Sequence, residues 1–302
     1  MKPILTVFTP TYNRAHTLHL GYEALLRQTC QDFIWLIVDD GSTDQTQELV
    51  NEWIAENKVS IQYHYQPNQG VHVAFNTAFH LINTELFVNV DSDDQLTDNA
   101  IEKIVDCWKH KGSKELAGII GLNQTFQGKI TETKLPNDRY SITLTEFYYR
   151  CRGKGDKTLV YRTDLIKNYP SYPVFKEEKF FPLSYLYYMI DQKYGMAILN
   201  IPLKKIAYHP DGLSTNIYQL YWNNSKGFAF YRIHEMKIAP TIKRRFIVCV
   251  HYVSSCIRNR DRQWLTKSPY KILTLLATPL GIALYFQIRR HIKNNLKYQV
   301  KY

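Results

Sequence analysis

The sequence predicts an α/β fold: a mostly parallel central sheet flanked by helices, followed by a basic helical extension at the C-terminus. Over the first ~100 residues, apolar runs rich in β-branched and aromatic residues alternate with segments whose apolar residues recur at helical spacing. The strand runs are nearly continuous in apolar residues, which is typical of parallel strands covered by helices on both faces. Such alternation of strands and helices favours a parallel sheet.

The predicted elements follow one another closely. Strands are predicted at residues 4–9, 33–38, 61–65 and 87–90. Helices are predicted at residues 16–28, around residues 49–54 and at residues 73–82, and Ser42 or Thr43 is expected to cap the second of them. Ligands of parallel sheets bind beyond the carboxyl ends of the strands, so the polar residues that follow each strand are the candidates for a binding site.

The fourth predicted strand ends in three carboxylates, Asp91, Asp93 and Asp94. Asp91 and Asp93 are two residues apart, so on an extended chain their side chains point the same way. Two hard oxygen donors suit Mg²⁺ or Mn²⁺, which keep coordination places for water and phosphate oxygens. An isolated Asp-x-Asp pattern is also typical of an acidic turn that caps the next helix, and Asp94 is expected to have that capping role.

Charge and cysteine content exclude several classes of protein. Residues 241–302 carry 13 Lys or Arg and one acid, Asp261, so most of the formal net charge of +11 belongs to this tail and is no nucleic-acid signature of the whole chain. The five cysteines show no metal-binding spacing, and polar residues begin by Thr9 and Asn13, too early for the core of a signal peptide. We therefore expect a cytoplasmic protein. Neither G-x-G-x-x-G nor G-x-x-x-x-G-K-[ST] is present, so no glycine-rich turn is expected to hold a nucleotide.

Four motifs together resemble those of family 2 glycosyltransferases. They are Thr-Pro-Thr-Tyr-Asn-Arg at 9–14, Val-Asp-Asp-Gly-Ser-Thr-Asp at 38–44, Asn-Gln-Gly at 68–70 with Asn76, and Asp-Ser-Asp-Asp at 91–94. The resemblance covers residues 3–110 closely and continues more weakly at 177–182 and 211–214, where it is to bacterial enzymes of surface-glycan synthesis. It implies a GT-A (Rossmann-like) fold and a nucleotide-diphosphate sugar donor, taken to be a UDP-sugar. We accordingly expect a domain at 1–240, with a nucleotide-sugar half (1–110) and an acceptor half (111–240), and a separate tail at 241–302.

The resemblance also implies the residues of the site. The nucleotide-sugar site would comprise Thr9, Pro10, Tyr12, Asn13, Arg14, Asp40, Gly41, Ser42, Asn76, Asp91 and Ser92. Tyr12 would stack on the base, and Asp40 would accept a hydrogen bond from the uracil imide. A bound Mn²⁺ or Mg²⁺ would be held by Asp93 and Asp91, with His209 as a further ligand. Ordinary structural or surface roles stay open for Tyr12, Arg14, Asn76 and His209.

The acceptor side requires a carboxylate that removes the proton of the attacking hydroxyl, and direct displacement then inverts the anomeric carbon. Glu178 is the predicted base, with Glu177 and Asp191 as alternatives. Related enzymes often read Glu-Lys-Phe-x-Pro-Glu here, whereas this chain has Leu183 at the second Glu position. If Glu178 is only a loop or cap residue, the enzyme is slow, inactive or uses another base.

The tail contains a mostly apolar run at residues 272–286, interrupted by Pro279 and Gly281. A membrane-spanning helix needs about 20 residues, so this run is short for a span. Lys and Arg residues flank it, which predicts an amphipathic segment or hairpin on anionic lipid at the inner face of the cell membrane. The alternative is a helical pair packed on the catalytic domain.

The sequence thus predicts an inverting, metal-assisted glycosyltransferase of bacterial surface-glycan synthesis, acting on a saccharide or polyprenyl-linked acceptor. Two alternatives stay open: a nucleotidyltransferase that makes sugar nucleotides, and a catalytically impaired glycan- or nucleotide-binding module.

Overall fold

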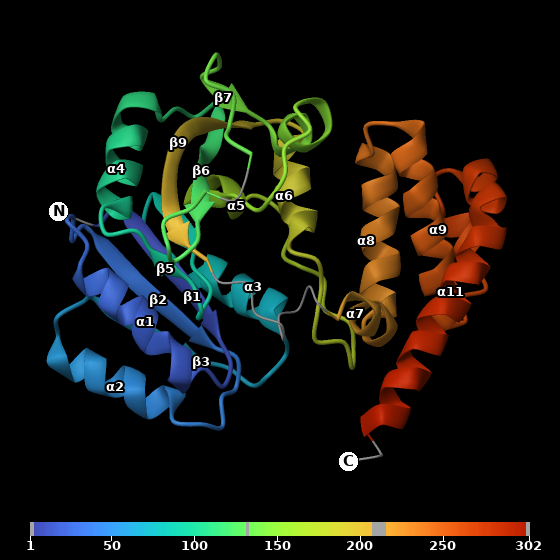
Figure 1. The fold of residues 1–302 in the computed structure, drawn as a ribbon, viewed down its shortest axis with the longest axis horizontal. Coiled ribbons are helices and arrows are strands. Elements are labelled where there is room, and N and C mark those ends of the chain that lie inside the picture. Colours follow the sequence, from blue (N-terminus) through green and yellow to red (C-terminus); the bar gives the residue numbers. More distant parts are fainter. Residues whose placement is uncertain (1–2, 131–132, 207–215, 300–302) are drawn as a thin grey trace. The chain divides into compact units, whose positions relative to one another are not determined.

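The chain folds into two compact units in a computed structural model that describes residues 3–130, 133–206 and 216–299 (Figure 1). The sheet unit comprises Met1–Ser171 and Leu186–Ala207. The helical unit comprises Tyr172–Tyr185 and Tyr208–Tyr302.

The first half of the sheet unit alternates strands and helices. Its elements are β1 (Leu5–Thr11), α1 (Ala15–Leu26), β2 (Phe33–Asp39), α2 (Thr46–Glu56), β3 (Ile61–Tyr65), α3 (Val71–Leu81), β4 (Leu86–Asn89), β5 (Gln95–Leu96) and α4 (Ala100–Lys111). The second half consists of β6 (Leu116–Gln124), β7 (Ser141–Ile142), a π-helix (Glu146–Arg150), β8 (Thr158–Arg162), α5 (Thr163–Ile166), α6 (Ser184–Asp191) and β9 (Gly195–Lys205). The predicted strands and helices of the first half are all present, with ends that shift by one to three residues.

In the described residues, nine strands form one sheet, ordered β3-β2-β1-β4-β8-β6-β9-β5, with β7 paired to β9. Strands β3, β2, β1 and β4 run parallel. Beyond β4 the sheet is mixed, because β8 runs antiparallel to both β4 and β6, while β9 runs parallel to β6. The prediction of an α/β fold with a central sheet of mostly parallel strands is confirmed.

Both faces of the parallel half are covered, which explains its nearly continuous apolar strands. Neighbouring side chains of a strand point to opposite faces. Val7 belongs to the core cluster that α1, α2 and α4 share with the sheet. The ring of Phe8, on the other face, meets Phe75 of α3 edge-on at 4.9 Å.

In its described residues, the helical unit contains five helices that follow one another from residue 217, together with the segment 172–185. The helices are α7 (Ile217–Asn223), α8 (Ser225–Ile238), α9 (Ile242–Asn259), α10 (Trp264–Lys267) and α11 (Lys271–Gln299). Its core joins Met236 of α8, Tyr252 of α9 and Ala277 of α11. Helix α8 and residues 172–185 are therefore part of the same compact unit as the tail, whereas the sequence-based division falls at residue 240. The physical reason is that α8 buries its apolar face in this shared core.

Two local expectations differ from the structure. Helix α2 begins at Thr46, so Ser42 and Thr43 do not cap it, and the carboxylate of Asp44 accepts from the Thr46 backbone N–H at 3.1 Å instead. In the tail, α11 is one continuous helix through Pro279 and not a hairpin. By length and composition alone, its segment Lys271–Asn294 would suffice to cross a membrane.

The packing of β6 on β8 yields a test of the sheet. Gly118 of β6 has φ +150°, and a Cβ there would lie 1.9 Å from the carbonyl oxygen of Val160. We expect Gly118→Ala to lower the free energy of unfolding by about 3 kcal/mol, because the two strands would have to separate. Gly128 is a matched control, since it has φ +80° with no atom within 4 Å of an added Cβ; Gly128→Ala should cost about 1 kcal/mol. Urea denaturation measures both, and equal losses would contradict the close approach of β6 and β8.

Candidate functional site

Three polar loops follow the carboxyl ends of neighbouring parallel strands (Figure 1). β1 and β2 are paired up to their ends, where Thr11 lies opposite Asp39. β4 ends on the other side of β1, with Asn89 opposite Phe8. The predicted motifs at 9–14, 39–44 and 91–94 are therefore gathered at one edge of the parallel half, where ligands of such sheets bind.

Asn13 and Ser42 join the first two loops to each other. The backbone N–H of Asn13 donates to Ser42 Oγ at 2.8 Å, and Asn13 Oδ1 accepts from the backbone N–H of Thr43 at 2.7 Å. Asn13 has φ +53°, a left-handed conformation that asparagine tolerates better than most residues. The Ala15 N–H donates to Asp44 Oδ2 at 3.1 Å across the same gap. These contacts fix the mutual position of the two loops.

Asp40 holds the turn that leads into α3. Its Oδ1 accepts from Gln66 Nε2 at 2.7 Å and from the Gln69 N–H at 3.0 Å, and its Oδ2 accepts from the Gly70 N–H at 2.7 Å. A carboxylate offers about four acceptor positions, and these contacts occupy three of them; Asp40 itself is 5% exposed. Gly41 is required beside it, because it has φ +85° and an added Cβ would lie 2.7 Å from the backbone nitrogen of Asn68.

The other predicted nucleotide-site residues differ in exposure. Tyr12 is 47% exposed and Arg14 is also exposed, so both side chains are accessible. Asn76 is half-buried on α3, and Pro10 is half-buried near the end of β1. Thr9 is buried, and its hydroxyl accepts from Trp35 Nε1 at 2.9 Å.

A small hollow lies beside the end of β1, where Thr9, Trp35, Asp91, Ser92 and Asp94 contribute to its lining. The rest of the lining is apolar and includes Val7, Leu18, Gly21, Leu25, Val90 and Leu96. The structure thus brings three predicted residues, Thr9, Asp91 and Ser92, to one hollow. Asp40 and Asp93 are not among its lining residues.

The acidic turn leaves two carboxylates available for a cation. Asp91 is exposed, and its Oδ1 accepts from Asn89 Nδ2 at 2.9 Å. Asp93 is half-buried. Within the described ranges no three His, Cys, Asp or Glu side chains are grouped as a metal site. Two carboxylates fit a divalent ion that takes its other ligands from water and substrate phosphates. His209 lies outside the described residues.

Asp94 is paired with Lys204 of β9, a residue that the sequence analysis missed. The two charged groups lie 3.0 Å apart and both side chains are about nine-tenths buried. Burial raises the pKa of Asp94 to about 6, although the Lys204 ammonium opposes that shift. The predicted capping role of Asp94 is wrong, because α4 begins at Ala100, six residues further on. No sequence motif marks Lys204, which is separated from Asp94 by 110 residues in the sequence.

The predicted catalytic base, Glu178, lies in the helical unit. Its two carboxylate oxygens accept from the backbone N–H groups of Lys226 and Gly227 at 2.8 and 2.7 Å, in the first turn of α8. Burial raises its pKa. Of the alternatives, Asp191 in the sheet unit accepts from the backbone N–H of Thr145 at 2.8 Å, and Glu177 is exposed with φ +69°. Glu178 therefore anchors a helix, whatever else it does.

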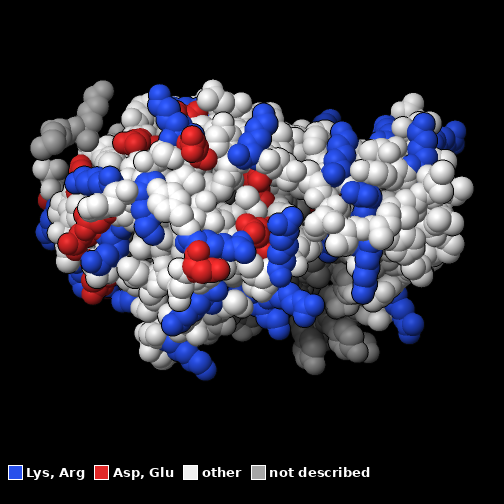
Figure 2. Space-filling view, turned by 90° about the horizontal axis from the view of Figure 1, so that it is seen from above, with Lys and Arg blue, Asp and Glu red and all other residues white. Residues whose placement is uncertain are grey.

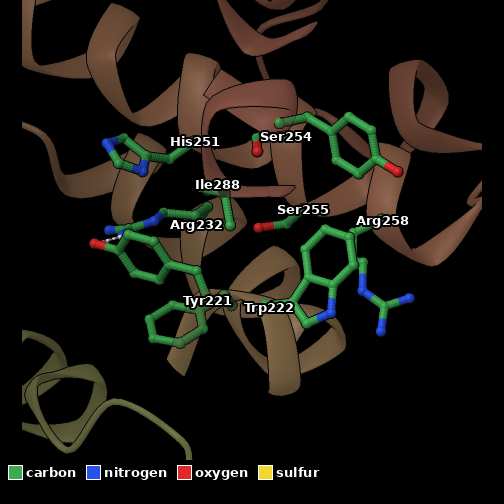
Figure 3. Close-up of a pocket in the computed structure, with 10 residues that line it drawn as sticks. Tyr221, Trp222, Arg232, His251, Ser254, Ser255, Arg258 and Ile288 are labelled. Atoms are coloured by element: carbon green, nitrogen blue, oxygen red, sulfur yellow. Dashed lines mark hydrogen bonds between the residues drawn. The ribbon is translucent and has the colours of Figure 1, made fainter. Parts of the chain in front are cut away.

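A second small hollow lies among α7, α8, α9 and α11 (Figure 3). Its charged and aromatic groups contact one another: Arg232 pairs with Glu235, and Arg258 lies 4.2 Å from the ring centre of Trp222. Burial lowers the pKa of His251 in this wall to about 4, so its ring is neutral at pH 7. The residues around this hollow thus contact one another, and we interpret the hollow as part of the packing of the helical unit.

Comparison with known proteins identifies the family. The model of the family described as "Glycosyl transferase family 2" matches residues 6–170, more than half of the chain. The chain belongs to glycosyl transferase family 2. The predicted family and enzyme class, a glycosyltransferase, are thus confirmed, and the assignment of individual site residues stays a prediction.

Several known proteins are similar to this chain. Chondroitin synthase of Escherichia coli is 35% identical over 104 residues, which are 34% of this chain and 15% of the synthase. An uncharacterized glycosyltransferase of Nostoc is 27% identical over 179 residues, 56% of this chain and 54% of that protein. The chain therefore spans about half or less of these relatives. Residues 1–349 of S. aureus TarS share the fold, with a TM-score of 0.58 at 17% identity over 96% of this chain and 91% of that one.

The Lys204–Asp94 pair gives a prediction for stability. Lys204→Met would leave the buried Asp94 carboxylate without its partner, so we expect a loss of about 3–5 kcal/mol in the free energy of unfolding. The double variant Asp94→Asn/Lys204→Met should recover part of that loss. Lys205→Met is the matched control, because Lys205 makes only a partly exposed pair with Asp98 at 3.8 Å; its loss should stay under about 1 kcal/mol. Equal losses for Lys204→Met and Lys205→Met in urea denaturation would contradict the role of the pair.

Proposed function

We propose that this family 2 chain is an inverting glycosyltransferase that moves a sugar from a UDP-sugar to a saccharide or lipid-linked acceptor in bacterial surface-glycan synthesis. The observation that carries the proposal is the gathering of the Asp40, Asp91 and Asp93 loops at one edge of the parallel strands. Crystal structures of TarS, which shares the fold at a TM-score of 0.56, contain UDP or UDP-GlcNAc. The name of the E. coli relative, a chondroitin synthase, supports a role in polysaccharide synthesis.

The nucleotide would be recognised by groups of the loops that follow β1 and β2. Asp40 keeps one acceptor position on Oδ2, which suits the N3–H of uracil, and its three protein contacts fix the direction of that position. The accessible ring of Tyr12 can stack on the base, and Arg14, at the start of α1, can pair with a phosphate oxygen. Asn13 and Ser42 would then support the pocket by locking the loops around it.

Asp91 and Asp93 would hold Mn²⁺ or Mg²⁺. When bound, the ion supplies positive charge beside the diphosphate leaving group. Asp94 faces the Lys204 ammonium, so two of the three carboxylates of the turn remain for a cation. Lys204 thereby also limits the negative charge that the turn presents to a diphosphate.

Glu178 remains the proposed base. Each of its oxygens accepts one N–H, so each keeps a second acceptor position for the hydroxyl of an acceptor sugar. Its raised pKa brings the carboxylate closer to the range in which a general base is effective at neutral pH. The same carboxylate would then both position α8 and accept the proton.

The donor and the metal can be tested together. We expect UDP release from at least one UDP-sugar when Mn²⁺ is added, and a loss of about 100-fold or more in Asp93→Asn without a change in Tm, because the variant retains the shape but not the charge of a ligand. Asp106→Asn, an exposed acid on α4, is the control and should keep full activity. Normal turnover by Asp93→Asn would contradict the metal role. Pyrophosphate formation from UTP would instead support a nucleotidyltransferase, and binding of UDP-sugars without turnover would support an impaired module.

The role of Glu178 is tested by Glu178→Gln, which keeps an acceptor oxygen for α8. If Glu178 is the base, kcat should fall by about 10²–10⁴-fold while the KM for the donor changes little. The Tm should also fall somewhat, because the amide NH2 of Gln faces one of the two backbone N–H donors of α8. In the unmodified enzyme, kcat should rise with pH through a pKa above the ordinary value for glutamate. Asp191→Asn serves as the comparison, because Asp191 is also buried and also accepts backbone N–H bonds. A drop in Tm with unchanged kcat in Glu178→Gln would leave only the anchoring role.

A further inference from the structure

Helix α11 has one face that packs within the helical unit. Thr274 and Ala277 are completely buried, and Ile288 and Ile292 are 4% and 6% exposed. Gly281, on the same face, lets α11 approach α9 closely, because a Cβ there would lie 2.6 Å from Val253. This face already has its partner, so α11 is held along much of its length by the rest of the unit.

The opposite face of α11 is apolar and exposed. At about 100° per residue, its large side chains fall on the side away from the packed face. We call this set the outer stripe; it consists of Ile272, Leu275, Leu276, Leu280, Ile282 and Phe286. Within it, Ile272 is 79% exposed and Leu276 is 65% exposed. A contiguous exposed apolar surface of this kind indicates an interaction site.

Positive charge flanks the outer stripe. Lys271 precedes it, and Arg289, Arg290 and Lys293 follow it; all four are exposed. In the sequence, no acid occurs after Asp261. On the face seen in Figure 2, the helical unit shows Lys and Arg side chains and no acidic ones.

We propose that the outer stripe is a membrane-docking face that lays α11 in the plane of an anionic lipid surface. The apolar side chains would enter the acyl boundary, while the flanking Lys and Arg side chains contact lipid phosphates. Each cation near such a surface adds to the attraction, and the tail has no acid beyond Asp261 to offset it. The inference does not depend on which sugar is transferred.

Charge complementarity favours lipid over a second copy of the chain. If two outer stripes paired antiparallel, Lys271 of each copy would face the Arg289 and Arg290 end of the other. Like charges placed opposite one another are destabilising, and the stripe carries no acid to balance them. An anionic bilayer supplies the negative charge that both ends require.

The packed face favours an in-plane helix over a spanning one. The segment Lys271–Asn294 has the length to cross a bilayer. To span, α11 would have to leave α9 and expose Thr274 and the Gly281 contact to lipid, which would also remove Ala277 from the core of the unit. Docking through the outer stripe needs no such rearrangement.

The test is flotation of the full chain with vesicles of phosphatidylcholine alone or mixed with phosphatidylglycerol. We expect binding to the mixed vesicles, weakened by raised salt, and at least a tenfold loss of binding in Leu276→Asn/Leu280→Asn. Ile54→Asn, at a 40% exposed apolar position of α2, is the matched control and should bind like the unmodified chain. Because the substituted side chains are exposed, the Tm should not change.

The role of charge is tested with the triple variant Arg289→Gln/Arg290→Gln/Lys293→Gln. Its control is the triple variant Lys58→Gln/Lys109→Gln/Lys114→Gln, which removes the same amount of charge from exposed positions of the sheet unit. Only the first set should lose binding to phosphatidylglycerol vesicles. Four outcomes would overturn the proposal: no binding of the unmodified chain, equal binding by both sets, resistance to alkaline carbonate extraction, which indicates a span, and a dimer that Leu276→Asn/Leu280→Asn dissociates. UDP release on a soluble acceptor is measured separately, so failure of docking and failure of the proposed transfer are distinguishable.

Discussion

The parallel pairing of β1 with β2 and β4 is the constraint on which the rest of the site depends. Hydrogen bonding in register places Thr11 beside Asp39 and Asn89 beside Phe8, so three loops far apart in sequence begin at the same edge. The register is fixed because both faces of these strands are buried, and a slip by one residue would exchange Val7 and Phe8 between the two cores. The packing of the strands against the helices therefore determines where the loops of the site lie.

The polar side chains at this edge divide by their partners. Asn13, Ser42 and Asp44 are engaged in joining two loops, and Asp40 positions the turn before α3. These residues pre-organise the edge, because their hydrogen bonds tie each loop to its neighbour, although only Asp40 among them is buried. Asp91, Tyr12 and Arg14 are exposed, so the structure leaves them accessible to a ligand.

The helical unit follows a different principle. It encloses a small core around Tyr252 and Met236, pairs its buried charges Arg232 and Glu235, and still presents large apolar side chains to the outside. Stability therefore does not explain the outer stripe, since residues that are 54–79% exposed, such as Leu280 and Ile272, gain little from folding. The exposed apolar side chains and the flanking cations together favour docking on an anionic lipid surface.

The sequence by itself determined the α/β class, the first four strands with the three helices between them, and the family, because periodicity and motif spacing are local properties of the chain. It could not show that Lys204 neutralises Asp94, or that Glu178 accepts two N–H bonds from α8, since these partners lie 110 and about 50 residues apart and follow from packing. Nor could it divide the tail residues between a packed face and an outer stripe. Tertiary structure decided that division. Apolar residues occur on both faces of α11, so the sequence does not distinguish them; Ala277 is buried in the core of the helical unit, whereas Leu276 is exposed.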